Sequence, residues 1–257
     1  MPSSKPPMKK PMSLRPRVQA DMPRAGMLLS AGLGRRMRPL TATRPKPLIS
    51  VNGKALIDYA LESYKRAGVD RVVVNTHYLA GQVEAHVRRV NHGLDIHLSD
   101  ERDELLETGG GCKKALPLIG ADPFFVSNSD NILIDGPMDA LALLAERWKP
   151  EQMDALLLLV PLARAHGYNG NGDFRMSGTG QLARQSGTRI APFIYSGTQI
   201  VKASLFEDTP EGPFSFNLIW DRLIETGRLY GMSHQGQWYH VGTPEAVKQT
   251  EELLREA

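Results

Sequence analysis

The fold of this chain is limited above all by a regular alternation of strand-like and helix-like segments from residue 25 to about residue 160. Short apolar runs rich in Val, Leu and Phe alternate with longer segments whose apolar residues recur at the helical spacing. Such alternation predicts a parallel sheet with helices on both faces, because a helix is the usual connection between parallel strands. Strands are expected at 27–31, 71–75, 94–98, 124–127 and 155–160, and helices at 55–67, 80–90, 110–116 (closed by Pro117) and 138–148.

The texture of the sequence changes after residue 160. Residues 164–188 are rich in Gly, Asn, Ser and Arg and contain few long apolar runs. Because no linker separates 25–160 from 161–257, we expect a single domain over 25–257. In the second half, strands are expected at 173–176, 181–184, 192–196, 229–233 and 238–241, and helices at 216–225 and 244–255.

Composition and charge argue against several classes of protein. The single cysteine, Cys112, permits no intrachain disulfide, which fits a cytoplasmic location, and no apolar run approaches the ~20 residues of a membrane span. Residues 1–24 carry six Lys or Arg against one Asp, whereas the net charge of the whole chain is only +3. We interpret 1–24 as a disordered, Pro-rich basic tail rather than a nucleic-acid-binding arm, and we expect neither nucleic acid nor a membrane as partner.

The first expected strand leads into a loop that combines glycines with fixed positive charge. The loop reads Gly-Leu-Gly-Arg-Arg-Met-Arg-Pro-Leu-Thr from Gly32 to Thr41, and Pro-Lys-Pro-Leu follows from Pro45. Glycines let a backbone approach an anion closely, and Arg and Lys supply charge, so the pattern is typical of a polyphosphate site. It is neither a Walker-type P-loop nor a dinucleotide fingerprint, because the Lys-Ser/Thr pair is missing and the third glycine position holds Met37.

This loop resembles the signature of the sugar-1-phosphate nucleotidyltransferases, and the resemblance covers about residues 25–250. It implies a Rossmann-like α/β fold with a mixed, mostly parallel sheet, in which 25–160 binds the nucleotide and 161–257 forms a smaller sugar-binding lobe. It also implies attack of a sugar-1-phosphate oxygen on the α-phosphorus of an NTP, giving an NDP-sugar and pyrophosphate. By the same resemblance, Arg36 is the triphosphate-binding catalytic arginine and Lys46 is the catalytic lysine that bridges phosphates. Further nucleotide contacts are expected from Ala31, Gly32, Gly34 and Arg35.

A carboxylate is expected at the end of the strand at 124–127. Asp130 follows this apolar strand and a short polar tip, and α/β sheets bind ligands at the carboxyl ends of their parallel strands. A carboxylate in that place suits Mg²⁺, so Asp130 is predicted both as a catalytic residue and as a metal ligand. Relatives usually have Gly-Asp at this point, whereas Ser129 precedes Asp130 here and keeps the residue small.

The second metal-ligand position departs further from the family. Relatives often carry Asp before a Val-Gly-Thr near the C-terminus, but this chain has His240 before Val241. Imidazole is a poorer ligand for Mg²⁺ than carboxylate and suits Mn²⁺ better, so the expected cofactor is Mg²⁺ with Mn²⁺ as the alternative. Three interpretations stay open: His240 binds the metal directly, it contacts metal-bound water or phosphate, or it is structural.

The remaining candidates concern the base and the sugar. A run of three glycines after Thr108 enters a helix, and in relatives this loop and the region of Asn75 face the nucleobase. The nucleotide contacts implied here are Asn75, Thr108, Gly109 and Gly110. The sugar contacts implied are Glu107, Asp173, Ser196 and Gly197. The Glu-Lys pair with which many relatives grip the sugar phosphate is missing.

The Gly-Asp-Phe-Arg segment at 172–175 resembles the N-acetylmuramate-1-phosphate uridylyltransferases of cell-wall sugar recycling. Together with the short chain and the lack of a C-terminal repeat domain, it favours UTP and N-acetylmuramate-1-phosphate as substrates, with a mannose-1-phosphate guanylyltransferase as the alternative. A metal-dependent glycosyltransferase is a weaker hypothesis, because a sugar donor's diphosphate does not need both Arg36 and Lys46. An inactive nucleotide-sugar sensor is supported by His240 alone. We expect a monomer or small homo-oligomer that acts on small molecules.

Overall fold

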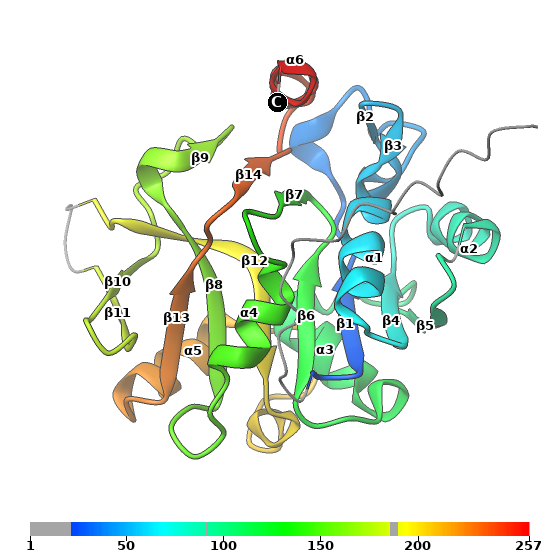
Figure 1. Cartoon of the computed structure of the whole chain (residues 1–257). Helices are drawn as coiled ribbons and strands as arrows, with labels where there is room; N and C mark the ends of the chain where they lie inside the picture. The colour runs from blue at the N-terminus through cyan, green and yellow to red at the C-terminus, as the bar shows by residue number, and fades with distance from the viewer. Residues whose placement is uncertain (1–21, 91, 186–189, 257) are drawn as a thin grey trace, which may run out of the picture.

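A computed structural model describes residues 22–90, 92–185 and 190–256 of the chain. It contains a mixed sheet with helices on both faces, and a smaller sheet and a hairpin lie at one end (Figure 1). The strands of the main sheet are β1 (Ala25–Leu29), β4 (Arg71–Thr76), β5 (Asp95–Asp100), β6 (Phe124–Asn128), β8 (Ala155–Pro161), β10 (Phe174–Met176), β11 (Leu182–Arg184), β12 (Phe193–Val201) and β13 (Leu229–Ser233). The small sheet comprises β7 (Asn131–Ile134), β9 (Ala165–His166) and β14 (Gln237–His240), and the hairpin comprises β2 (Ser50–Val51) and β3 (Lys54–Ala55). The helices are α1 (Leu56–Ala67), α2 (Ala80–Arg89), α3 (Glu107–Ile119), α4 (Ala140–Arg147), α5 (Asn217–Glu225) and α6 (Pro244–Glu256).

Strand pairing joins the two halves of the chain in one sheet. β1 lies between β4 and β6 and is parallel to both, and β5 is parallel to β4. β12, from the second half, is antiparallel to both β6 and β8, and β13 is parallel to β8. The predicted α/β fold with a mixed sheet is therefore confirmed. Its parallel part is formed mainly by the first half of the chain, as the alternation of segments predicted.

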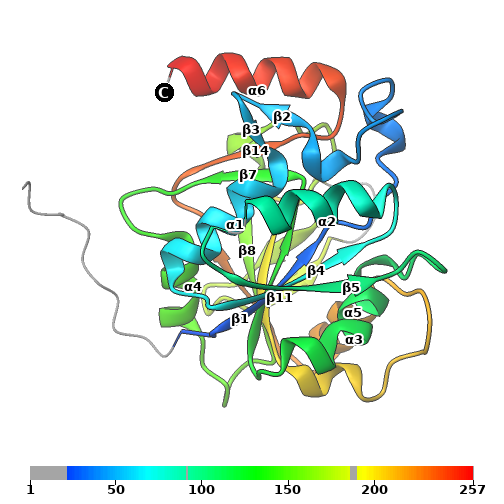
Figure 2. The same cartoon turned by 90° about the vertical axis from the view of Figure 1, so that its right-hand side faces the viewer.

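Apolar side chains alternate between the two faces of the sheet, as the strand period of two requires. On one face, Met27 and Val126 pack with the apolar side chains of α3 and α5. On the other face, Leu28 and Phe125 pack with those of α1, α2 and α4. Figure 2 shows α3 and α5 together on one side of the sheet. The continuous apolar runs of the sequence are thus explained by strands that are buried on both sides.

Two elements run past the residues that were expected to end them. α3 starts three residues earlier than predicted and continues through Pro117, which lies in its last turn. Little of the helix follows the break that a proline causes at this place. β12 continues beyond residue 196 across a bulge in which Gly197 takes a left-handed backbone (φ 92°). In both places a residue that usually interrupts an element is tolerated where the backbone pattern is already ending or irregular.

A third apolar cluster ties the charged loop to the C-terminal helix. Met37, in the short 3₁₀ turn Arg35–Met37, is fully buried and belongs to this cluster. Its partners include Ile132 of β7, Val241 just after β14 and Val247 of α6, the helix that lies above the sheets in Figure 2. One small core therefore supports the charged loop and both strands that neighbour the predicted metal ligands.

The folded part begins slightly before residue 25. Most of the predicted tail, residues 1–21, lies outside the described residues. Met22 packs against the core beneath α1, and Arg24 Nε donates to Asp70 Oδ2 at 2.7 Å, so residues 22–24 belong to the fold. Among the helices of the described residues, none has the length and apolar character needed to cross a bilayer.

Candidate active site

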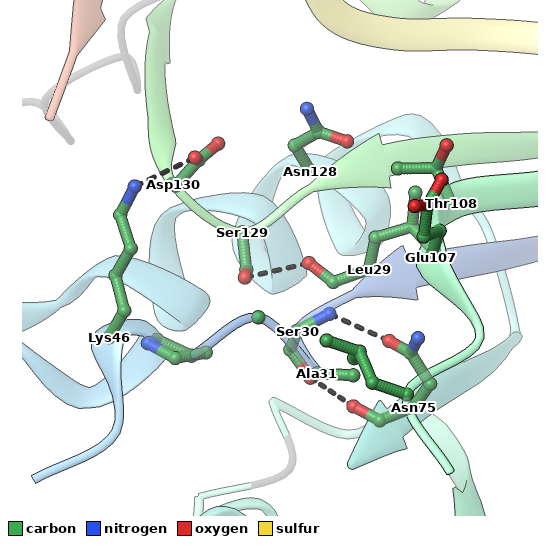
Figure 3. Close-up of a pocket in the computed structure, with 13 residues that line it drawn as sticks. Leu29, Ser30, Ala31, Lys46, Asn75, Glu107, Thr108, Asn128, Ser129 and Asp130 are labelled. Carbon is green, nitrogen blue, oxygen red and sulfur yellow. Dashed lines mark hydrogen bonds and ion pairs between the residues drawn. The ribbon is translucent and has the colours of Figure 1, made fainter. Parts of the chain in front are cut away.

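A pocket opens where the chain leaves the carboxyl ends of β1 and β6 (Figure 3). Its walls come from the loop after β1, the turn at Lys46, the end of β4, the start of α3 and the turn after β6. The lining residues are Leu29, Ser30, Ala31, Gly32, Lys46, Pro47, Asn75, Leu105, Glu107, Thr108, Asn128, Ser129 and Asp130. Its volume of about 220 Å³ is below the ~300–1,000 Å³ of pockets that enclose a whole drug-sized ligand. The pocket therefore suits one part of a larger ligand, with the rest extending from its mouth.

The charged loop after β1 has a defined shape of its own. Gly34 takes a left-handed backbone (φ 60°) and begins the turn Arg35–Met37. Thr41 Oγ1 donates to the Gly34 carbonyl at 2.8 Å, and a Cβ on Gly34 would lie 3.0 Å from Thr41 Cγ2. Tyr78 Oη in turn donates to the Thr41 carbonyl at 2.9 Å. Conformation and close packing both require glycine at this position, so the loop is held in place before any ligand arrives.

Arg35 and Arg36 project from this turn and are exposed. Within the part of the chain that the structure describes, neither guanidinium forms an ion pair or a hydrogen bond. Arg36 nevertheless acts electrostatically on both Asp130 and His240. The structure thus places Arg36 beside the pocket rather than in its lining, as a positive charge that remains available to an anionic ligand.

The predicted catalytic lysine and the predicted metal ligand form an ion pair. Lys46 Nζ lies 2.8 Å from Asp130 Oδ2, and the two side chains are only 12% and 27% exposed (Figure 3). Burial acts to raise the pKa of Asp130, but the Lys46 ammonium, with help from His240 and Arg36, brings that pKa below its ordinary value. Asp130 is therefore ionised at neutral pH. Its second oxygen, Oδ1, is buried and has no hydrogen-bond partner among the described residues.

The turn that carries Asp130 is fastened to the end of β1. The Ser129 N–H donates to the Leu29 carbonyl at 3.1 Å, and the Ser129 hydroxyl donates to the same carbonyl at 2.8 Å, the bond drawn in Figure 3. A glycine at this position would keep the first of these bonds and lose the second. The Ser129 hydroxyl thus adds a contact that holds Asp130 against the pocket.

A buried polar network that the sequence analysis missed supports the same pocket. Asn75 Oδ1 accepts from the Ser30 N–H, and Asn75 Nδ2 donates to Glu101 Oε1, both at 2.7 Å. Glu101 is fully buried, which raises its pKa, and its other oxygen accepts from the Leu106 N–H just before α3. Asn75 lines the pocket as predicted, but its side-chain amide links the loop after β1 to the start of α3. A single acid after a strand matches no motif, so no sequence signal pointed to Glu101.

The structure divides the predicted base-binding segment into two parts. Glu107, with a left-handed backbone (φ 59°), and Thr108 line the pocket. Gly109 and Gly110 do not, and their N–H groups both donate to the Phe214 carbonyl, at 2.9 Å and 3.1 Å. A Cβ on Gly109 would lie 2.3 Å from the Phe214 ring. These two glycines therefore serve close packing, and their predicted contact with a base stays a prediction.

The predicted sugar-side residues other than Glu107 meet at the bulge of β12, outside the lining of the pocket. Asp173 Oδ2 accepts from the Tyr195 N–H at 2.8 Å, directly before Ser196 in the chain. Burial raises the pKa of Asp173, and Ser196 is fully buried. A Cβ on Gly197 would lie 2.4 Å from Asn131 Nδ2. The structure brings these residues together through internal contacts, and their binding of a sugar stays a prediction.

His240 lies on the strand beside Asp130. It pairs across β14 and β7 with Asn131, whose Oδ1 lies 3.0 Å from His240 Nδ1, and the Trp238 indole stacks on its ring. Burial lowers the pKa of His240; the Asp130 carboxylate opposes this effect and Lys46 adds to it. The net result is a pKa below the ordinary value, so His240 is neutral at pH 7.

These side chains fit a divalent ion that also takes ligands from its substrate. Asp130 offers an unpartnered carboxylate oxygen, and His240 offers a neutral imidazole from the neighbouring strand. Over 22–90, 92–185 and 190–256, no group of three or more His, Cys, Asp and Glu side chains could hold a metal. Mg²⁺ commonly keeps water and phosphate ligands, so a site with few protein ligands is compatible with it.

Comparison with known proteins points to the same class of protein as the charged loop and the pocket do. Residues 25–172 match the family model described as Nucleotidyl transferase. An N-acetylmuramate alpha-1-phosphate uridylyltransferase of Caulobacter vibrioides is 45% identical over 241 residues, which is 93% of this chain and 100% of the relative. A protein of the same name from Neisseria meningitidis serogroup B is 34% identical over 231 residues, which is 88% of this chain and 96% of the relative.

Solved structures agree on the fold. A putative glucose-1-phosphate thymidylyltransferase from Bacillus anthracis, in complex with a sucrose, has a TM-score of 0.76 and 19% identity, covering 91% of this chain and 96% of that one. The family model spans more than half of the chain and begins where β1 begins. With its charged loop, its Lys46–Asp130 pair and its pocket at the strand ends, this chain belongs to the nucleotidyl transferase family, as a sugar-1-phosphate nucleotidyltransferase.

Proposed function

We propose that this chain transfers a uridylyl group from UTP to N-acetylmuramate-1-phosphate. An oxygen of the sugar phosphate forms a bond to the α-phosphorus, the bond between that phosphorus and the β-phosphate oxygen breaks, and UDP-N-acetylmuramate and pyrophosphate are the products. The observation that carries the reaction is the Lys46–Asp130 pair at a pocket lined by both predicted nucleotide-binding segments. The choice of substrates is supported by the 45% identity with a relative of that name, over 93% of this chain.

The positive charges around the pocket suit a reaction between two negatively charged substrates. Both reactants are anions, so catalysis depends on positioning and on neutralising charge rather than on a covalent intermediate. In the proposed complex the nucleoside lies in the pocket, against Glu107 and Thr108. The triphosphate extends toward Lys46 and the exposed Arg36, which has no protein partner among the described residues. Both cations then act on the phosphate oxygens where negative charge develops.

A divalent ion completes the proposed site. Asp130 would hold Mg²⁺ or Mn²⁺ through its unpartnered Oδ1, with His240 nearby on β14. The ion would supply further positive charge to the phosphates. Lys46, which pairs with Asp130 in the described structure, is then free to turn its ammonium group toward the substrate.

A pyrophosphate-release screen tests this proposal. Each of the four NTPs is combined with N-acetylmuramate-1-phosphate, N-acetylglucosamine-1-phosphate or mannose-1-phosphate, with Mg²⁺ or Mn²⁺, and the Asp130→Asn variant serves as control. We expect release that requires both UTP and N-acetylmuramate-1-phosphate. Release that requires GTP and mannose-1-phosphate would show that the substrates assigned here are wrong, although the type of reaction would stand. Transfer from a finished NDP-sugar would show a glycosyltransferase instead. Tight binding of nucleotide sugars without turnover would show an inactive sensor.

A further inference from the structure

Asn131 is a buried amide that stands between the two predicted metal ligands, although no motif pointed to it. It follows Asp130 in the chain and opens β7, where it pairs across the strands with His240. Asn131 is only 8% exposed, so both ends of its amide need partners inside the protein. The partners that it has determine how His240 is presented to the site.

The hydrogen bonds of Asn131 place a proton on one nitrogen of His240. Asn131 Nδ2 donates to the Ser196 carbonyl at 3.0 Å, and because a carbonyl can only accept, the other end of the amide must be the oxygen. This oxygen also can only accept, and it lies 3.0 Å from His240 Nδ1. Nδ1 therefore carries a proton. A neutral imidazole has one such proton, so Nε2 keeps its lone pair.

The surroundings hold the ring in place, and Nε2 forms no hydrogen bond with any of the described residues. Trp238 donates from its indole nitrogen to the same Ser196 carbonyl at 2.8 Å, and it stacks on the imidazole with ring centroids 5.9 Å apart. Gly242 lies on the Nε2 side, where a Cβ would be 2.6 Å from His240 Nε2. Gly242 is not among the glycines with positive φ, so its backbone would accept alanine. The need for glycine comes from the space beside Nε2.

We propose that Asn131 and Gly242 are positioning residues that present the unprotonated Nε2 of His240 as a direct ligand of the divalent ion held by Asp130. The proposal rests on the proposed function and selects direct ligation from the three roles left open for His240. A nitrogen lone pair repels phosphate oxygens and attracts a cation, so direct contact with phosphate is excluded. A hydrogen bond at the other nitrogen is the usual device that orients a metal-binding histidine. Because imidazole suits Mn²⁺ better than Mg²⁺, the site favours Mn²⁺.

The protonation of His240 is measurable without metal or substrate. In the metal-free chain labelled with ¹⁵N at histidine, we expect the His240 resonances to show a protonated Nδ1 and an unprotonated Nε2. Asn131→Leu removes the acceptor and should abolish this preference, whereas Asn131→Asp keeps an acceptor toward Nδ1 and should retain it. A wild-type His240 that carries its proton on Nε2 would overturn the proposal.

Coordination of the ion by His240 is tested with Mn²⁺ as the probe, alone and with a non-hydrolysable UTP analogue. Pulsed EPR should detect coupling of Mn²⁺ to an imidazole nitrogen, and His240→Asp should remove that coupling. Asn131→Leu and Gly242→Ala should each weaken Mn²⁺ binding by about 10–100-fold, the usual cost of changing a residue that orients a metal ligand. Gly242→Ala should cost little in the His240→Asp background, because the shorter side chain removes the close contact.

His166 supplies a matched control, because it lies in β9 of the same small sheet and stacks on Tyr239 instead. His166→Gln should leave the nitrogen coupling and the Mn²⁺ affinity unchanged. Mn²⁺ that binds without nitrogen coupling, or does not bind at all, would overturn the assignment of His240 as a ligand. The proposed function has a separate readout: it fails if UTP and N-acetylmuramate-1-phosphate give no pyrophosphate with any divalent ion.

Discussion

The Lys46→Met substitution removes the charge that faces Asp130 and keeps most of the apolar stem. The two charges are 2.8 Å apart and mostly shielded from water. At a separation of ~3 Å and an effective dielectric constant of ~20, their attraction amounts to about 5 kcal/mol. Methionine also avoids the cost of burying an ammonium group, so the net loss is smaller. We expect the free energy of unfolding to fall by about 2–3 kcal/mol, between the ~0–1 kcal/mol of a surface pair and the ~3–5 kcal/mol of a broken buried pair.

The pH dependence of this loss follows from the pKa of Asp130. That pKa is lower in the folded protein than the value of about 3.9 expected for an unfolded chain. The pair therefore stabilises the fold fully above the unfolded pKa, and its contribution disappears as the pH falls through the folded pKa. In urea unfolding, the difference between wild type and Lys46→Met should be largest at neutral pH and should shrink below about pH 4.

The same substitution should move metal binding and turnover in opposite directions. The Lys46 ammonium competes with a divalent ion for Asp130, so Lys46→Met should bind Mn²⁺ more tightly in the absence of substrate. The gain is about tenfold for each ~1.4 kcal/mol of competition removed. Turnover should fall by about 10² or more, because a cation that acts on the phosphates is lost.

Lys54→Met is the matched control for this experiment. Lys54 pairs with Glu62 in the β3–α1 region, and both side chains are more than a third exposed. This substitution should change the free energy of unfolding by less than ~1 kcal/mol and should leave Mn²⁺ affinity and turnover unchanged. If Lys46→Met unfolded like the wild type and bound Mn²⁺ with the same affinity, the Lys46–Asp130 pair would not have the role assigned to it.

Three further substitutions, one of them with a matched control, separate catalytic from structural roles. Arg36→Ala should reduce turnover by about 10² with little change in urea unfolding, because the side chain is exposed; near-normal turnover would refute the assignment. Gly110→Ala should destabilise the chain by about 1–3 kcal/mol, because its Cβ would lie 2.3 Å from the Gly212 carbonyl oxygen. In the matched change Gly81→Ala in α2, the added Cβ meets open space and should stabilise the chain by up to ~1 kcal/mol. Equal melting temperatures of the Gly110→Ala and Gly81→Ala variants would refute the assignment of Gly110 to close packing. Glu101→Ala leaves Asn75 Nδ2 and the Leu106 N–H unpaired and should cost about 2–4 kcal/mol in urea unfolding; unchanged stability would contradict the network.

The first half of the fold was predictable because its signals are local. Residues 71–76 form β4 within one residue of the expected range, and α1 ends at Gly68 in a left-handed cap as its sequence suggests. The pairing of β12 between β6 and β8 was not foreseen in detail. It depends on contacts between residues far apart in the sequence, such as Thr198 with Ser127, which hydrophobic periodicity does not report.

The candidate site was predictable where a motif places charge at the end of a strand. Lys46 and Asp130 meet in the structure although 84 positions separate them. The residues that support them were not predictable in this way. Glu101 and Asn131 match no motif, and their roles appear only through the buried hydrogen bonds that they form with other segments. The role of Gly110 depends likewise on the segment near Phe214 that folds against it.

A crystal structure of the chain with Mn²⁺ and a non-hydrolysable UTP analogue would test the placement of the nucleotide. We expect the uridine in the pocket beside Thr108, the triphosphate against Arg36 and Lys46, and the ion on Asp130, with the Lys46–Asp130 contact lengthened from its present 2.8 Å. A nucleotide bound elsewhere, with Arg36 in solvent and Lys46 still paired with Asp130, would contradict the proposed site.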